Sequence, residues 1–414
     1  MKKGFLKLFV VVIVFSLFGC KDSNVNVPQN NQPNEITIGA LVSLTGNWST
    51  LGITSKAALE IAVKKINQNF IDEGINIKIN LKVIDTKLDP EIAYVKTGEL
   101  ISQGVKIIIG PQSSSELSRI RPLVNQNDVI VVSMGSTDGS LAIPNDHILR
   151  FCPDDKPEGK GVSKLMWERG IREVVAVYLN DNGNIGLKRS MTQNFINSGG
   201  SVIDSLTYSS DSDITANFIS QLSTIVNNAS NPNDVGIYLA GFDEVAKVFT
   251  MSSSDVVLSS KKWFGSNGSA GSSILISNNA AAKFGNSVEF CSPLFSLSFE
   301  TESDWSPLVT LIEQETQLKP DAYAFAAYDA LMVAALTFKS VGASTGLPTL
   351  FNKFVEISST YRGLTGLTEL NEAGDRKFGN FTFLGVCGVD PNFAWKDVGF
   401  YNAATDIISD TGCL

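Results

Sequence analysis

The sequence predicts an α/β protein built from two lobes of similar construction. Short apolar segments, typical of buried strands, alternate with segments in which apolar residues recur at helical spacing. This alternation indicates parallel βαβ units whose strands are buried on both faces. The alternation breaks near residues 150–153 and then begins again. The chain has 414 residues, more than one hydrophobic core usually holds, so two lobes suit both the pattern and the length.

The first lobe is predicted from four strands that alternate with three helices. Residues 36–42 are almost entirely apolar, and residues 77–83 alternate between apolar and polar side chains; both patterns favour strands. Pro90 stands at a helix's first turn, where a missing N–H is tolerated. The predicted strands are residues 36–42, 77–83, 106–109 and 129–132, and the predicted helices are residues 52–70, 90–102 and 114–127.

The second lobe repeats this order. Its predicted strands are residues 173–178, 202–208, 235–239 and 262–265, and its predicted helices are residues 157–169, 185–198, 213–227 and 243–252. After a break near 290–293, we expect helices at 303–316 and 321–340 and a strand-rich segment at 364–389, with a turn at Asn371–Gly374. Residues 321–340 are apolar enough to suggest a membrane span, but Asp329 and the many alanines favour a buried core helix.

The N-terminus has the pattern of an export signal followed by a lipid attachment site. A basic start and a short apolar run precede Cys20, in a sequence that resembles a bacterial lipobox. This pattern predicts a signal peptide at 1–19 and a lipid-attached flexible linker at 20–34. A plain signal peptide with an incidental cysteine is the alternative. The apolar run is about half of the ~20 residues that a membrane span needs. We therefore expect an extracytoplasmic chain that lipid on Cys20 anchors to a membrane.

Composition excludes several classes of function. The formal net charge of −9 argues against a nucleic-acid partner, which would need a basic surface. The single histidine and the lack of CxxC spacing argue against a metal site, and we expect no cofactor. Residues 342–346 match GxSxG, but a helix precedes them and no histidine follows, so they do not form a nucleophile elbow. We therefore expect a binding protein and not an enzyme.

Hydroxyl-bearing loops follow three of the predicted strands of the first lobe. In parallel sheets, ligands bind at the carboxyl ends of the strands, where these loops begin. Ser113, Ser114, Ser136 and Thr137 offer hydroxyls beside backbone N–H groups, which suits an anion such as a carboxylate. Two neighbouring edges of this kind favour a carboxylate-binding crevice, although Ser113 with Glu116 also fits a capping box. The loop with Thr45 and Trp48 follows the first strand, and Trp48 either covers the core or forms an apolar wall of a pocket.

These loops, in this order, resemble the type I periplasmic binding proteins of the leucine/isoleucine/valine-binding family. The segments that carry the resemblance are residues 38–46, 60–67, 84–90, 109–114, 132–137 and 365–376. The resemblance implies two Rossmann-like lobes, joined by a three-segment hinge, that close on a ligand. It places the three crossings near residues 150–153, 291–294 and 362–366. Lobe 1 is then 35–150 with 294–363, lobe 2 is 151–293 with 364–405, and 406–414 is a C-terminal tail.

The resemblance also implies the ligand contacts. In lobe 1 they fall on Trp48, Ser114, Gly135 and Thr137, with Thr45, Ser113 and Ser136 beside them, and in lobe 2 on Asp155, Phe242 and Asn267. Two positions depart from the family pattern. Gly183 stands where the family has a pocket tyrosine, and Asn267 stands where an acid holds the ammonium group of an amino acid. An amide cannot balance a buried ammonium, so either the ligand is not an α-amino acid or Asp155 or Asp181 takes that role.

The resemblance also implies a pairing of the cysteines and a protein partner. Four cysteines outside the signal allow three pairings, and buried thiols are the alternative. Because hinge segments run side by side in this family, Cys152 is expected to pair with Cys291, which leaves Cys387 and Cys413 to secure the tail. The implied function is capture of a small carboxylate-bearing ligand, amino acid or related compound, by a monomer that delivers it to an ABC permease. The alternatives are a sensor of the same fold and a surface lipoprotein that binds another protein.

Overall fold

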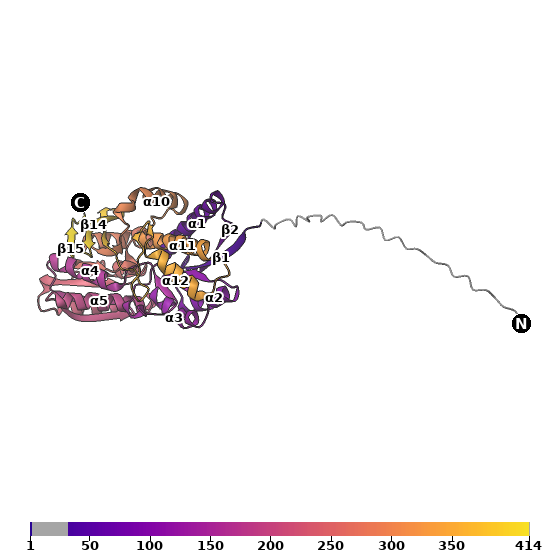
Figure 1. Cartoon of the computed structure of the whole chain (residues 1–414). Coiled ribbons are helices and arrows are strands. Elements are labelled where there is room, and N and C mark those ends of the chain that lie inside the picture. The colour runs from indigo at the N-terminus through magenta and orange to yellow at the C-terminus, as the bar shows by residue number, and fades with distance from the viewer. Residues whose placement is uncertain (2–31, 414) are drawn as a thin grey trace.

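The computed structural model describes residue 1 and residues 32–413, which fold into two lobes that lie side by side (Figure 1). The expected signal peptide, Cys20 and nearly all of the expected linker lie outside the described residues. We call the lobe that holds the N-terminal sheet lobe 1 and the other lobe 2. Most predicted elements form within a few residues of their expected bounds.

Lobe 1 has a five-stranded parallel sheet in the order β2-β1-β3-β4-β5. Its strands are β1 (Asn34–Val42), β2 (Ile77–Asp85), β3 (Ile107–Ile109), β4 (Ile130–Ser133) and β5 (Ile148–Arg150). One face packs on α1 (Ser49–Asp72), α10 (Glu302–Thr316), α11 (Ala322–Val341) and α12 (Leu347–Ser358). The other face packs on α2 (Pro90–Ser102) and α3 (Ser114–Asn125). Both faces are buried, as expected for parallel strands.

Lobe 2 has an eight-stranded mixed sheet in the order β15-β14-β13-β10-β9-β8-β6-β7. Its strands are β6 (Glu173–Leu179), β7 (Ser201–Tyr208), β8 (Val235–Ala240), β9 (Lys262–Gly265), β10 (Cys291–Phe295), β13 (Phe381–Val389), β14 (Asn392–Asn402) and β15 (Ile407–Asp410). Helices α4 (Asp155–Glu168) and α5 (Asn182–Asn197) pack on one face. Helices α6 (Ala216–Asn227), α7 (Val245–Ser252), α8 (Ser273–Ser277) and α9 (Asn279–Ser287) pack on the other.

Strand pairing moves two crossings and the tail from their expected places. The first crossing lies between β5 and α4. The second follows Phe295, because β10 pairs with β9 and β13 of lobe 2. The third follows Asp375, because this residue forms a parallel bridge with Arg150 in lobe 1. The short strands β11 (Arg362–Gly363) and β12 (Gly366–Leu367) precede it. Residues 407–410, expected as tail, are the edge strand β15.

Helix α11 is a core helix. Among the described residues it alone is long and apolar enough to cross a membrane, and most of it is buried inside lobe 1. The Asp329 carboxylate, fully buried, accepts hydrogen bonds from the backbone N–H groups of Leu364 and Thr365 at 2.8 and 3.0 Å and from the Thr365 hydroxyl. The charge therefore has partners inside the protein, and it ties α11 to the segment before the third crossing.

The cysteines pair differently from the expectation at the hinge. Cys387 and Cys413 form a disulfide that joins β13 to the end of the chain. Cys152 and Cys291 are free and buried, so the expected Cys152–Cys291 bond is wrong. Each thiol faces a partner other than the second cysteine. Cys152 Sγ donates to the Ser136 carbonyl at 3.4 Å, and Cys291 Sγ accepts from Arg169 Nη1 at 3.4 Å. Burial raises the pKa of Cys152 to about 12 and that of Cys291 to about 11.

Candidate ligand-binding site

The candidate site is the crevice where the carboxyl ends of the two sheets face each other. Direct hydrogen bonds cross this crevice, so the lobes stand in a closed arrangement. The hydroxyls of Thr50 and Ser273 lie 2.8 Å apart, and the Asn182 N–H donates to Ser115 Oγ at 3.2 Å. A cavity of about 730 Å³ remains between the lobes, with Arg119 on the lobe 1 side and Asp181 and Phe242 on the lobe 2 side.

Ser113 and Ser114 are neighbours with different tasks. The Ser113 hydroxyl donates to Glu116 Oε2 at 2.7 Å and accepts the Glu116 N–H, which is the capping box that begins α3. The Ser114 hydroxyl instead faces the loop after β4, where it accepts hydrogen bonds from Ser136 Oγ at 3.0 Å and from the Asp138 N–H at 3.2 Å. Ser113 therefore lines the cavity while its hydroxyl is engaged by its own helix, and the Ser114 hydroxyl is engaged by the loop after β4.

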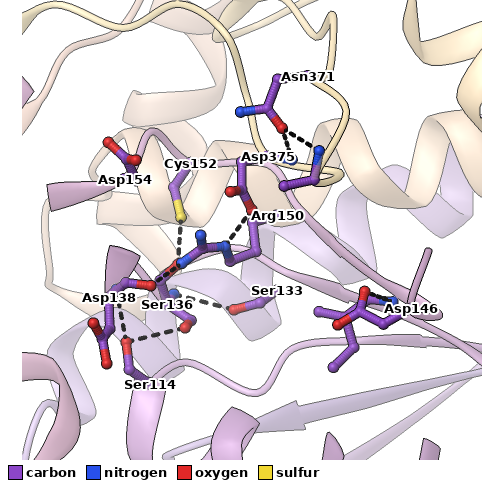
Figure 2. A network of polar contacts seen from close by, with 12 residues as sticks. Ser114, Ser133, Ser136, Asp138, Asp146, Arg150, Cys152, Asp154, Asn371 and Asp375 are labelled. Atoms are coloured by element: carbon purple, nitrogen blue, oxygen red, sulfur yellow. Dashed lines mark hydrogen bonds and ion pairs between the residues drawn. The ribbon is translucent and has the colours of Figure 1, made fainter. Parts of the chain in front are cut away.

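Arg150 holds the loop after β4 in place (Figure 2). Its guanidinium donates from Nη1 to the carbonyl oxygens of Ser136 and Asp138 at 3.2 and 2.8 Å, and its Nε donates to Asp375 at 2.5 Å. Arg150 and Asp375 are both nearly inaccessible to solvent. This buried pair links the hydroxyl-bearing loop to the segment that leads into the third crossing, so the loop geometry depends on the hinge.

Aromatic side chains from both lobes meet at Trp48. The Trp48 ring lies 5.1 Å from Phe242 and 6.2 Å from Tyr323 between ring centroids. Gly135 lies against the same ring: a Cβ there would stand 3.2 Å from Trp48 Cη2 and 2.9 Å from the Gln112 carbonyl oxygen. A larger residue at 135 would therefore displace the tryptophan. Trp48 is therefore buried between side chains of both lobes.

Asp155 is a buried acid whose polar neighbour is Thr137. It lies at the start of α4 and is 3% exposed; neither carboxylate oxygen makes a hydrogen bond of normal geometry to a described residue, and the Thr137 side chain lies near enough to lower its pKa. Its backbone N–H donates to the Thr137 carbonyl at 2.9 Å, which brings these two residues together. Burial raises the pKa of Asp155 to about 7; the Thr137 side chain partly offsets this increase, and the nearby Asp138 adds to it.

Asn267 is held by an acid that sequence reasoning missed. Glu158 accepts the Asn267 backbone N–H at 3.0 Å and its side-chain amide at 2.7 Å, and that amide also donates to Tyr323. Glu158 is 1% exposed, and burial raises its pKa well above the usual value, with Asp155 adding to the effect. The available signal was its spacing, because residues three apart share a helix face and Glu158 follows Asp155 by three.

Three other positions complete the comparison with the sequence. Thr45 turns away from the crevice, because its hydroxyl donates to Asp85 at 2.7 Å in an exposed position. Asp181 caps α5 by accepting the Asn184 N–H at 2.8 Å, and burial raises its pKa to about 6. Gly183 lies beside Ser114, since a Cβ there would stand 3.6 Å from Ser114 Oγ. Of the predicted ligand contacts, Ser113 and Phe242 line the cavity. The others are buried where the two lobes contact each other: Trp48, Ser114, Gly135, Ser136, Thr137, Asp155 and Asn267.

Known proteins resemble this chain over most of its length. The family model for the receptor family ligand binding region matches residues 54–386, most of the chain. The chain belongs to this family. Over 95% of its length it is 28% identical to an uncharacterized protein of Methanocaldococcus jannaschii, of which it covers 96%. It is 25% identical, over 37% of its length, to the Leu/Ile/Val-binding protein BraC3 of Rhizobium johnstonii, of which it covers 41%.

Solved structures confirm the fold of this family member. The branched-chain amino acid transporter substrate binding protein LivJ from Streptococcus pneumoniae, in complex with isoleucine, superposes with a TM-score of 0.73 at 18% identity, covering 88% of this chain and all of that one. A solute binding protein of an ABC transporter from R. palustris, in complex with benzoate, has a TM-score of 0.70 at 15% identity, covering 88% and 96%. The fold is that of a type I periplasmic binding protein, as the sequence predicts.

Asp155 makes stability depend on pH. An unfolded aspartate titrates near about 3.9, and burial raises the folded pKa to about 7, so between these values the folded state holds a proton that the unfolded state lacks. The contribution of Asp155 to the free energy of unfolding is therefore fully present below about pH 4 and is lost as the pH rises through about 7. We expect Asp155→Asn to remove this part of the pH dependence, worth about 1.4 kcal/mol per pH unit across the window.

Urea unfolding of the ligand-free protein at pH 5 and pH 8 measures this difference. Asp128→Asn, at an exposed position, is the matched control for the change in net charge. Parallel pH profiles for wild type and Asp155→Asn would refute a buried, protonated Asp155.

Proposed function

We propose that the protein is an extracytoplasmic solute-binding protein, anchored by lipid on Cys20, that captures an amino acid-like ligand and delivers it to an ABC importer. The observation that carries this proposal is the unpaired Asp155 carboxyl group beside Thr137, near the hydroxyl of Ser114. A ligand carboxylate binds the hydroxyls and N–H groups of lobe 1. A ligand ammonium binds Asp155, and Trp48 and Phe242 cover the apolar part.

The proposed ligand class follows from charge. Asp155 without a ligand is costly as an anion, and an ammonium group within reach stabilises the charged form. Glu158 keeps its acceptors on Asn267, which leaves Asp155 for the ligand, with Asp181 at the cavity as the alternative acid. The similar structures are complexes with isoleucine and with benzoate, which both carry a carboxylate, and this supports the lobe 1 half of the proposal.

The mechanism is a population shift between open and closed lobes. A ligand that contacts both lobes binds the closed state better and so increases its share. The permease then recognises the closed shape. The family description as a receptor ligand-binding region favours one second candidate, a sensor of the same fold that signals to a membrane protein. Stimulation of a purified permease's ATPase by the liganded protein separates the two functions.

A thermal-shift screen of amino acids, amides, small carboxylates and peptides tests the proposal. A ligand at 100 times its dissociation constant adds about 2.7 kcal/mol of stability. L-isoleucine, 2-methylbutylamine and 3-methylpentanoate form a matched set, in which the second lacks the carboxylate and the third lacks the ammonium group. We expect the largest shifts from compounds that carry both groups. A screen without any shift would contradict solute binding, and equal shifts from carboxylates that lack an amine would contradict the role of Asp155.

A further inference from the structure

Helix α1 begins at the crevice without a side-chain cap of its own. Its N-cap residue, Trp48, has a φ of 57° and makes no side-chain cap hydrogen bond. An indole has no acceptor for the free N–H groups that every helix start leaves. Serine, threonine, aspartate or asparagine usually fills this role from the cap position itself. A side chain at the cap position accepts the N–H of the second or third helical residue, so the backbone N–H of the cap residue Trp48 needs an acceptor from another residue.

The acceptor comes from lobe 2. Asp243 Oδ2 accepts the Trp48 backbone N–H at 2.8 Å, and Oδ1 accepts the Ser272 hydroxyl at 2.5 Å. Asp243 is 6% exposed, so water competes little for this bond. The preceding residue, Phe242, lies against the ring of the same tryptophan. Two consecutive residues of lobe 2 thus hold Trp48: Asp243 binds its backbone N–H, and Phe242 contacts its ring.

This bond exists only while the lobes meet. Trp48 follows β1 in lobe 1, Asp243 follows β8 in lobe 2, and the Thr50–Ser273 contact lies two residues further along, in the first turn of α1. We infer that Asp243 is a positioning residue that caps helix α1 across the crevice and so holds Trp48 in its closed-state position. The role rests on the proposed capture of a ligand between the lobes. Asp243 does not touch the ligand; it acts through Trp48 and through the stability of the closed state.

Disulfide trapping measures closure without any ligand. The variant pair Thr50→Cys with Ser273→Cys replaces two hydroxyls that lie 2.8 Å apart across the crevice, so its oxidation rate reports the closed population. We expect Asp243→Ala in this background to slow trapping about 5- to 30-fold, the equivalent of a lost N-cap. Asp243→Asn keeps an oxygen acceptor and is expected to stay within about threefold. Because no ligand is present, failure here is distinct from failure of the proposed function.

The matched control is Asp255→Ala. Asp255 caps within lobe 2 alone, where it accepts the Leu258 N–H at 2.9 Å, so its loss has a local cost in lobe 2 without a contact to lobe 1. We expect its trapping rate to match the parent. Circular dichroism verifies folding, and Asp243→Ser repeats the test if Asp243→Ala does not fold. Equal trapping rates for the parent and the folded Asp243 variant would overturn the inference.

Hydrogen exchange in the trapped protein isolates the positioning role. The disulfide holds the lobes together, so protection of the Trp48 amide then depends on its own hydrogen bond. We expect Asp243→Ala to lose at least about tenfold of that protection and Asp243→Asn to retain most of it. Unchanged exchange at Trp48 in trapped Asp243→Ala would show that the cap does not hold this residue.

Discussion

Arg150→Met is expected to lower the free energy of unfolding by about 3–5 kcal/mol, because it leaves a buried carboxylate without its partner. Arg150 and Asp375 are 1% and 3% exposed, and their bond joins lobe 1 to the segment before the third crossing. The same guanidinium binds the carbonyl oxygens of Ser136 and Asp138. The loss therefore removes both a charge pair and the support of the hydroxyl-bearing loop.

Urea unfolding compares this variant with two others. Arg119→Met is the matched control, since Arg119 forms a two-point pair with Glu91 at 2.6 and 2.9 Å on the surface, where solvent screens the charges and such pairs contribute little to stability. Arg150→Met with Asp375→Leu removes both charges and is expected to recover much of the stability. If Arg150→Met costs no more than Arg119→Met, the buried pair does not have the importance assigned to it.

The double variant Ser114→Ala with Thr137→Ala is expected to weaken ligand binding at least about 100-fold while the protein remains folded. Each hydroxyl supplies a hydrogen bond to a charged group, and such bonds contribute about 1.5–3 kcal/mol. Neither hydroxyl begins a helix, in contrast to Ser113. Isothermal titration with the compound that gives the largest thermal shift measures the change in dissociation constant.

Two controls separate binding from folding in that experiment. Thr224→Ala with Ser277→Ala removes exposed hydroxyls that bond only to carbonyls of their own helices, and affinity is expected to stay the same. Ser113→Ala removes the cap of α3 and is expected to lower stability by about 1 kcal/mol with little change in affinity. An affinity in Ser114→Ala with Thr137→Ala equal to that of wild type would place the ligand elsewhere.

The part of the candidate site that lies in loops after parallel strands could be predicted from the sequence. Trp48, Ser114 and Thr137 each follow a strand that periodicity identifies, and the carboxyl ends of these strands meet at one edge. Glu158 and Asp243 were not assigned roles from the sequence. Their partners, Asn267 and Trp48, lie more than one hundred residues away along the chain, so no local pattern indicates that these pairs meet.

The sequence by itself determined the alternation of strands and helices, the two lobes and the hydroxyl-bearing loops. Each of these can be recognised from the pattern of side chains within short segments of the chain. Only the tertiary structure decided the crossings after Phe295 and Asp375, the edge strand β15, the free thiols of Cys152 and Cys291, and the cap that Asp243 provides. Those features depend on which distant segment pairs with which, and that choice is made by packing and hydrogen bonding across the whole fold.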